Sequence, residues 1–260
     1  MFMEKFIAKK KFGQNFLTSD RIINQIVDSA TVDKNDLIIE IGPGKGALTS
    51  KLVKKGCQVL AFEIDNDTKP YLDQIEGDNL SVIFGNFLDA NLKEVLSKFK
   101  YNNLYIIANL PYYITTPIIT KIIDSGINPK QLTLMVQKEV AERFCAKPGN
   151  KEYGYFTVKL NYYFDISKLC DVKRQFFSPQ PNVDSAVVVF KYKEYDNKLS
   201  DKFDQLITKS FRMKRKTLKN NLEKELFNKL LPELMNNGYG IDVRAEQIDL
   251  ETYIKLAKLL

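Results

Sequence analysis

Short apolar runs alternating with helix-compatible segments constrain the fold of this chain more than any other feature. The runs are rich in β-branched or aromatic residues and are bounded by turn residues, at Leu37–Ile41, 59–62, Leu80–Phe84, 104–108 and 132–136. The intervals between them hold stretches that suit helices, at 46–55, 68–75 and 117–123. Alternation of this kind is typical of a parallel sheet covered by helices on both faces. The sequence therefore predicts an α/β fold with a doubly wound parallel sheet.

The pattern changes toward the end of the chain. Ser185–Tyr192 has the character of a late strand, which we expect to be antiparallel at the far side of the sheet. After about Asn197 the apolar residues fall at helical spacing, as in Phe203, Leu206 and Ile207, and no strand-like alternation remains. A chain of 260 residues has room for two unequal domains. We expect residues 1–197 to form the sheet domain and residues 198–260 a small all-helical domain.

A glycine-rich turn after the first predicted strand suits a nucleoside cofactor. Gly42 and Gly44 stand where the chain must turn tightly and let its backbone approach a ligand. Glu63 follows about 20 positions later, at the end of the second predicted strand, where an acidic residue binds ribose hydroxyls. The spacing G-x-G-x-G, with no later glycine to seat a pyrophosphate, favours S-adenosylmethionine over NAD. A tight turn that binds nothing is the alternative interpretation.

A second motif, Asn109-Leu110-Pro111-Tyr112, ends another apolar run and suits a planar base that carries an amine. The Asn109 side chain can accept a hydrogen bond from an exocyclic amine. The Leu110 carbonyl is left free for the same task, because Pro111 has no N–H and holds the chain off the regular ladder. Tyr112 can stack on the ring. The alternative is a strand that ends in an X-Pro turn with a buried asparagine.

Composition restricts the chemistry and the partners. The chain has no histidine, so the usual general base and the commonest metal ligand are missing, and we expect no metal site. A reaction whose electrophile is already positively charged fits this restriction. The 39 Lys and Arg residues outnumber the 32 Asp and Glu residues, and the net charge of +7 favours a polyanionic partner. No long apolar run or secretion signal is present, so we expect a cytoplasmic protein without membrane contact.

Five motifs occur in the order found in the ribosomal RNA adenine dimethyltransferases, and the chain resembles that family over nearly its whole length. The motifs are residues 14–17 (QNFL), 40–44 (EIGPG), 109–113 (NLPYY), 177–185 (FSPQPNVDS) and 211–218 (FRMKRKTL). The chain is most similar to the bacterial small-subunit (16S) branch, for which the FGQNFL start and the RKTL segment are typical. The erythromycin-resistance methyltransferases share the first four motifs but usually differ in the last.

The resemblance implies a Rossmann-like methyltransferase sheet that binds S-adenosyl-L-methionine in residues 1–197, and a helical rRNA-binding domain in residues 198–260. Asn15 and Leu17 would close over the cofactor, Gly42 would admit its methionine part, and Glu63 would hold its ribose. Asn109 would lie beside the same cofactor.

One position departs from the family pattern. Relatives usually carry an aspartate after the third strand that contacts the adenine amine of the cofactor, and Asn86 stands at that position here. Its side-chain oxygen can accept the same bond without the negative charge, so cofactor affinity would be weaker. Asp89 would take this role if the alignment slips.

The mechanism implied by the resemblance is direct in-line methyl transfer to N6 of adenine. Hydrogen bonds from the amine to Asn109 and to the Leu110 carbonyl would aim its lone pair at the methyl group, without a dedicated base. The target base must leave its stack and enter between Tyr112 and Phe177. The alternative for Phe177 is a plain core position.

Basic residues supply the expected RNA contacts. They are Lys9, Lys10 and Lys11 near the start of the chain, and Arg212, Arg215 and Lys216 in a stretch predicted to be helical. A solvated helix face is the ordinary explanation of such charge runs. Two basic clusters in a chain of positive net charge favour contacts with an RNA backbone, which set affinity and orientation.

Three functions remain open from the sequence. The first is N6,N6-dimethylation of two adjacent adenosines in the 3′-terminal hairpin of 16S rRNA, within the 30S subunit or its late precursor, by a monomeric enzyme. The second is an erythromycin-resistance activity on 23S rRNA, against which residues 211–218 argue. The third is a non-catalytic RNA-binding assembly factor, against which the intact Asn109–Tyr112 motif argues.

Overall fold

The computed structural model describes residues 8–9 and 12–260, which separate into two compact units. The first unit runs to Ala141 and includes Ser167–Tyr192, and the second comprises Glu142–Ile166 and Lys193–Leu260. The expected division at 197/198 therefore lies near the observed one at 192/193. The second unit also takes in residues 142–166, which the expected division assigns to the sheet domain.

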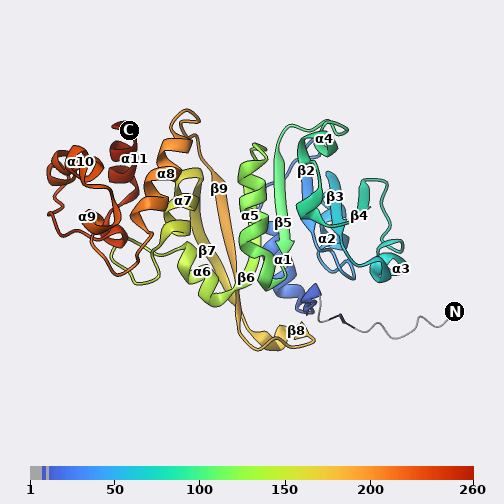
Figure 1. Ribbon diagram of the computed structural model, residues 1–260. Helices are drawn as coiled ribbons and strands as arrows, with labels where there is room; N and C mark the ends of the chain where they lie inside the picture. The colour runs from blue at the N-terminus through green and yellow to red at the C-terminus, as the bar shows by residue number, and fades with distance from the viewer. Residues whose placement is uncertain (1–7, 10–11) are drawn as a thin grey trace. The chain divides into compact units, whose positions relative to one another are not determined.

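The described residues form a seven-stranded sheet in the order β4-β3-β2-β5-β6-β9-β7, which runs from right to left in Figure 1. Neighbours from β4 to β6 are parallel, and β9 is antiparallel to β6. The strands are β2 (Leu37–Ile41), β3 (Gln58–Glu63), β4 (Leu80–Phe84), β5 (Leu104–Asn109), β6 (Gln131–Gln137), β7 (Phe164–Val172) and β9 (Ser185–Tyr192). This confirms the predicted doubly wound sheet.

Strand β7 was not predicted from the sequence. Its residues are mostly exposed or half-buried, and only its first and last side chains are buried. An edge strand of this kind lacks the continuous apolar run of a central strand such as β2, in which all residues are buried. As a result, β9 lies inside the sheet and β7 forms its edge.

Helices α1 (Asp20–Asp28) and α2 (Thr49–Val53) cover one face of the sheet. Their buried apolar residues share a core cluster with Ile38, Val59 and Tyr105, which are register neighbours on the adjacent strands β2, β3 and β5. Each such side chain contributes roughly 1.5–3 kcal/mol on full burial. The connection from β4 to β5, which contains α4 (Leu92–Leu96), crosses the sheet in the reverse direction, and the chain continues in that direction to β6 through α5 (Thr115–Asp124). Because such crossovers are right-handed, α4 and α5 lie on the opposite face of the sheet.

The order of the strands brings three candidate site residues together at the carboxyl ends of adjacent strands. The chain leaves β2 toward β3 on one side and later returns to β5 on the other. In the register, Ile41 pairs with Phe62 of β3 and with Ala108 of β5. The residues that follow, Gly42, Glu63 and Asn109, therefore meet at the carboxyl ends of adjacent parallel strands. This is where doubly wound sheets bind ligands.

The second unit is mostly helical and also includes residues 164–166 of β7. It contains α7 (Tyr155–Tyr163), α8 (Ser200–Ser210), α9 (Leu218–Asn221), α10 (Lys224–Asn236) and α11 (Leu250–Lys258). The rings of Tyr162 and Phe203 stack with centroids 4.2 Å apart, and Lys159 Nζ lies 3.1 Å from Asp204 Oδ1. These contacts between α7 and α8 explain why residues 142–166 belong to this unit. No described helix has both the length and the apolar character needed to cross a membrane.

Candidate active site

Three adjoining hollows meet at Gly42 on the carboxyl edge of the sheet. Asn109 lines two of them, one shared with Glu63 and Tyr112 and the other with Leu17 and Glu40. The third is lined by Asn86 and Phe62, among others. The structure thus brings together most of the candidates from the sequence in one continuous region.

The backbone at Gly42 and Gly44 requires glycine for different reasons. Gly42 has φ +73°, and a β carbon built there would meet no atom within 4 Å, because it would point into open space at the meeting point of the hollows. Gly44 has φ +57°, and a β carbon there would lie 2.7 Å from Phe16 Cε1. The first glycine therefore leaves room for a ligand, and the second leaves room for the aromatic side chain that covers the turn.

Glu63 is held rigidly behind this turn. Its carboxylate accepts hydrogen bonds from the Gly44 N–H (2.8 Å) and from the Asp65 N–H (2.8 Å). Burial raises the pKa of Glu63, and the two backbone donors oppose that rise. Each carboxylate oxygen retains a lone pair after these bonds, so Glu63 can still accept from hydroxyl groups.

The segment before Leu17 is fastened over the site by long-range contacts. Asp65 accepts from Gln14 Nε2 (2.7 Å) and forms an ion pair with Lys9 Nζ (2.6 Å). Strand β1 (Phe16–Leu17) pairs with β8 (Phe177–Ser178). The ammonium of Lys9, expected to contact RNA, is therefore already paired with Asp65, and also with Asp67.

Asn109 presents an acceptor to the hollow. Its Nδ2 donates to the Asn15 carbonyl at 3.0 Å. Because a carbonyl only accepts, this contact fixes the orientation of the amide. Among the described residues, no donor reaches Asn109 Oδ1 or the Leu110 carbonyl. Two acceptors thus stand at the end of β5, on its last residue and on the next one, and both residues line the same hollow.

The two aromatic candidates differ in their surroundings. Tyr112 lines the hollow, and its hydroxyl shares a 2.8 Å hydrogen bond with Ser185 Oγ of β9, which anchors the ring. Phe177 is only 5% exposed and packs in the core cluster with Leu17 and Ile22. Its burial agrees with the alternative of a core position, and the stacking role expected for Phe177 stays a prediction. Its backbone pairs with that of Leu17, which belongs to the same core cluster.

Asn86 lies at the hollow lined by Phe62, as expected for an adenine contact. Its Oδ1 accepts from the Leu88 N–H at 3.1 Å, and its Nδ2 donates to Asp89 Oδ2 at 3.0 Å. The side chain is therefore fixed, and one lone pair of Oδ1 remains for a ligand. Asp89, the alternative to Asn86, is exposed and lies outside the residues lining the three hollows.

The sequence reasoning missed Glu40, a fully buried carboxyl of β2. Its Oε2 has no hydrogen-bond partner among the described residues, and the side chain lines the hollow that it shares with Asn109. Burial, supported by the charge of Glu63, raises the pKa of Glu40 to about 8, although the Thr49 hydroxyl opposes the rise. A glutamate inside the apolar run LIIEI was the available signal. An unpartnered buried acceptor beside a hollow indicates a ligand that donates or carries positive charge.

Glu40→Gln should make stability less dependent on pH. The pKa of Glu40 is raised from 4.5 to about 8 on folding, so the native state binds more protons than the unfolded state between these values. Wild-type stability should fall across this range, and the variant should gain roughly 2–4 kcal/mol relative to it between pH 5 and 8.5. Urea unfolding at several pH values measures this. Exposed Glu76→Gln is the control, and equal pH profiles for all three proteins would contradict the assignment.

The basic residues of the second unit lie in a loop, not in the helix that the sequence predicted. Helix α8 ends at Ser210, and Arg212, Arg215 and Lys216 are exposed beyond it. The Asn221 side chain fixes this loop, because its Oδ1 accepts from the Met213 N–H (2.7 Å). Its Nδ2 donates to the carbonyls of Met213, Lys216 and Thr217. The remaining RNA candidates, Lys10 and Lys11, lie outside the described residues.

Comparison with known proteins agrees with the motifs. Residues 5–260 match the family described as ribosomal RNA adenine dimethylase. A protein of Mycoplasmopsis pulmonis named Ribosomal RNA small subunit methyltransferase A is 46% identical over 253 residues, covering 96% of this chain and 97% of the relative. The protein of that name from Aster yellows witches'-broom phytoplasma is 44% identical over 258 residues, covering 95% and 94%.

Two solved structures share the architecture. A dimethyladenosine transferase from Plasmodium falciparum has a TM-score of 0.76 at 27% identity, covering 92% of this chain and 95% of that one. The 23S rRNA methyltransferase ErmE has a TM-score of 0.74 at 22% identity, covering 95% and 99%. At that identity the second likeness bears on the fold alone. Together they confirm the Rossmann-like methyltransferase fold.

Proposed function

The chain belongs to the ribosomal RNA adenine dimethylase family, and we propose that it dimethylates N6 of two adjacent adenosines in the 3′-terminal hairpin of small-subunit (16S) ribosomal RNA. The substrate is the small subunit or a late precursor of it, modified in the cytoplasm during assembly. The names of the relatives support the small subunit as target, as does the RKTL segment at residues 215–218.

The residues at the carboxyl edge fit S-adenosylmethionine. Glu63 would accept from the ribose hydroxyls with its remaining lone pairs, and Asn86 from the adenine amine. The open space at Gly42 would admit the methionine part, whose ammonium would pair with the orphaned oxygen of Glu40. When bound, this cofactor supplies a methyl group on a positively charged sulfur, which needs no further activation.

The chain contributes position and polarity to the transfer. Asn109 Oδ1 and the Leu110 carbonyl each accept one N–H of the adenine amine, which directs the nitrogen lone pair away from the ring plane. Tyr112, anchored through Ser185, supports the ring from one side. The bound cofactor would supply its methyl group to this nitrogen, and the amine would release its proton to water. In the second round the amine keeps one N–H, so only one of the two acceptors can hold it.

The acceptor pair at Asn109 and Leu110, on the hollow that Glu63 also lines, is the observation that carries this proposal. The test is complementation of cells that lack dimethyladenosine in their small-subunit RNA, with mass spectrometry of both ribosomal RNAs. Restored dimethyladenosine in the 3′-terminal hairpin supports the proposal. Its appearance in 23S rRNA would indicate the resistance activity instead, and its absence from both would indicate a binding protein.

We expect the exposed loop after α8 to contact the RNA backbone. Arg215→Gln with Lys216→Gln should weaken binding to small subunits and lower the salt slope of log K by roughly 1.5, since each lost phosphate contact removes about 0.7–0.9. Lys224→Gln with Lys229→Gln on α10 removes the same charge as a control. Filter binding across salt concentrations measures both slopes. If the two double variants behave alike, the loop has no specific role.

A further inference from the structure

A second large hollow lies at the opposite end of the sheet from the active site. It has a volume of about 950 Å³ and is lined where β5 and β6 begin, at Leu104 and Lys130. Asn109 at the other end of β5 lines the active site, so the two regions are separated by the length of this strand, about 16 Å at ~3.3 Å per residue. None of the residues assigned to cofactor or base binding lines this hollow.

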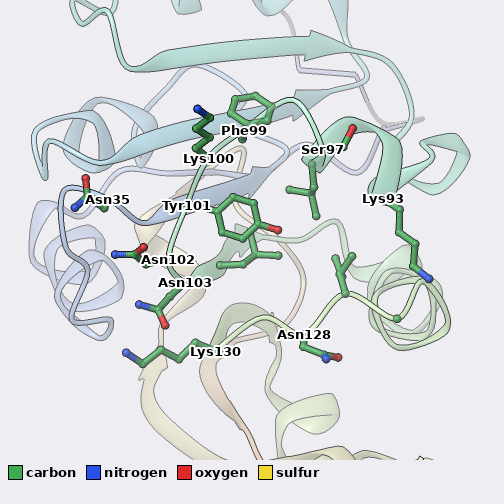
Figure 2. Close-up of a pocket in the computed structure, with 14 residues that line it drawn as sticks. Asn35, Lys93, Ser97, Phe99, Lys100, Tyr101, Asn102, Asn103, Asn128 and Lys130 are labelled. Atoms are coloured by element: carbon green, nitrogen blue, oxygen red, sulfur yellow. The ribbon is translucent and has the colours of Figure 1, made fainter.

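Three lysines from separate segments surround it. Lys93 comes from α4, Lys100 from the loop before β5, and Lys130 from the residue just before β6. Figure 2 shows them on different sides of the hollow, with Tyr101 between them. All three are exposed, and no carboxylate among the described residues lies within ion-pair distance of them. Elsewhere in the same unit, Lys55 and Lys69 do form ion pairs.

The rest of the lining combines asparagines and aromatic rings with aliphatic residues, Ser97 and Gly126, and no Asp or Glu lines the hollow in the described chain. Its wall is preformed. Buried Asp36 accepts from the backbone N–H of Asn103 (3.0 Å) and from its Nδ2 (2.8 Å), and the Asn102 N–H donates to the Asn35 carbonyl (2.8 Å). Half-buried Tyr101 offers an aromatic face at the centre. Exposed ammonium groups beside an aromatic platform are the features that bind a single nucleic-acid strand.

We propose that this lysine hollow, defined by Lys93, Lys100, Lys130 and Tyr101, binds a strand of the substrate RNA away from the adenosine being methylated. The inference rests on the proposed function, because it takes the bound polymer to be the methylated one. The hollow is wide and open, which suits a polymer that passes through it. The three ammonium groups contact phosphates, and Tyr101 stacks on an unpaired base.

The test compares two triple variants with the same loss of charge. One carries Lys93→Gln, Lys100→Gln and Lys130→Gln. The other carries Lys51→Gln on α2, Lys54→Gln just after it and Lys69→Gln on α3 (Lys69–Leu72), none of which lines the hollow. Binding is measured on unmethylated small subunits from about 50 to 200 mM salt. The hollow variant should bind at least about tenfold more weakly, with a salt slope lower by roughly 2, and the control should keep the wild-type slope. Both should keep the wild-type cofactor affinity.

An unchanged slope in the hollow variant, or equal losses in both variants, would overturn the inference. Tyr101→Ala alone should also lower affinity several-fold without changing the slope, because stacking carries no charge. Wild-type methyl transfer to the same subunits is measured in parallel. If the wild-type protein transfers no methyl group, the proposed function fails. If transfer is normal but the hollow variant binds small subunits as the wild type does, only the RNA-binding role of the lysine hollow is refuted.

Discussion

Replacing Asn109 with alanine is expected to slow single-turnover methyl transfer by roughly 100-fold or more, while cofactor affinity changes only a few-fold. The variant loses Oδ1, which in our account holds one N–H of the target amine and aims its lone pair. Removing a single preorganised hydrogen-bonding group from an active site costs about 100- to 1000-fold in rate. Single-turnover kinetics and calorimetric titration of the cofactor measure the two effects separately.

The control is Asn66→Ala, an exposed asparagine outside the hollows, which should leave both quantities unchanged. Equal losses of transfer and cofactor binding in Asn109→Ala would show that Asn109 mainly supports the cofactor or the Asn15 segment. That result would remove the role assigned to its side-chain oxygen.

Gly42→Ala should lower cofactor affinity by at least tenfold, whereas Gly56→Ala should leave it unchanged. The two glycines have φ of +73° and +78°, and a β carbon at either would meet no atom within 4 Å. Both substitutions therefore carry a similar backbone strain, roughly 1–2 kcal/mol. Only the β carbon at position 42 enters the hollows around the site.

Urea unfolding of both variants measures the cost of backbone strain, and calorimetric titration measures whether the added β carbon prevents the cofactor from binding. Similar losses of stability together with a loss of affinity confined to Gly42→Ala would support the cofactor site. If Gly56→Ala also lost affinity, the effect would be general destabilisation, and the space at Gly42 would have no special role.

The parallel strands and the candidate site residues could be predicted from local sequence pattern and from one rule of sheet topology. Apolar runs located the parallel strands, and in a parallel sheet the residues after each strand meet at one edge. Pattern and rule together suffice to place Gly42, Glu63 and Asn109 at a common edge. The motif around Asn109 carried its chemistry in consecutive residues, so no long-range information was needed.

What the sequence could not predict depends on contacts between distant residues. Phe177 on β8 packs in one core cluster with Leu17, its partner on β1, and Lys9 is paired with Asp65, which lies 56 positions away. Residues 142–166 join the second unit through the stacking of Tyr162 on Phe203. None of these pairings leaves a periodic signal. Glu40 is different, since a charged residue within a buried strand was visible in the sequence.

The most direct test of the account is transfer of labelled methyl groups from S-adenosylmethionine to small subunits from cells that lack this modification, with large subunits in parallel. The wild-type protein should place label as N6,N6-dimethyladenosine in the 3′-terminal hairpin of the small-subunit RNA, and the Asn109→Ala protein should place almost none. Label confined to large-subunit RNA, or no label in either, would contradict the account.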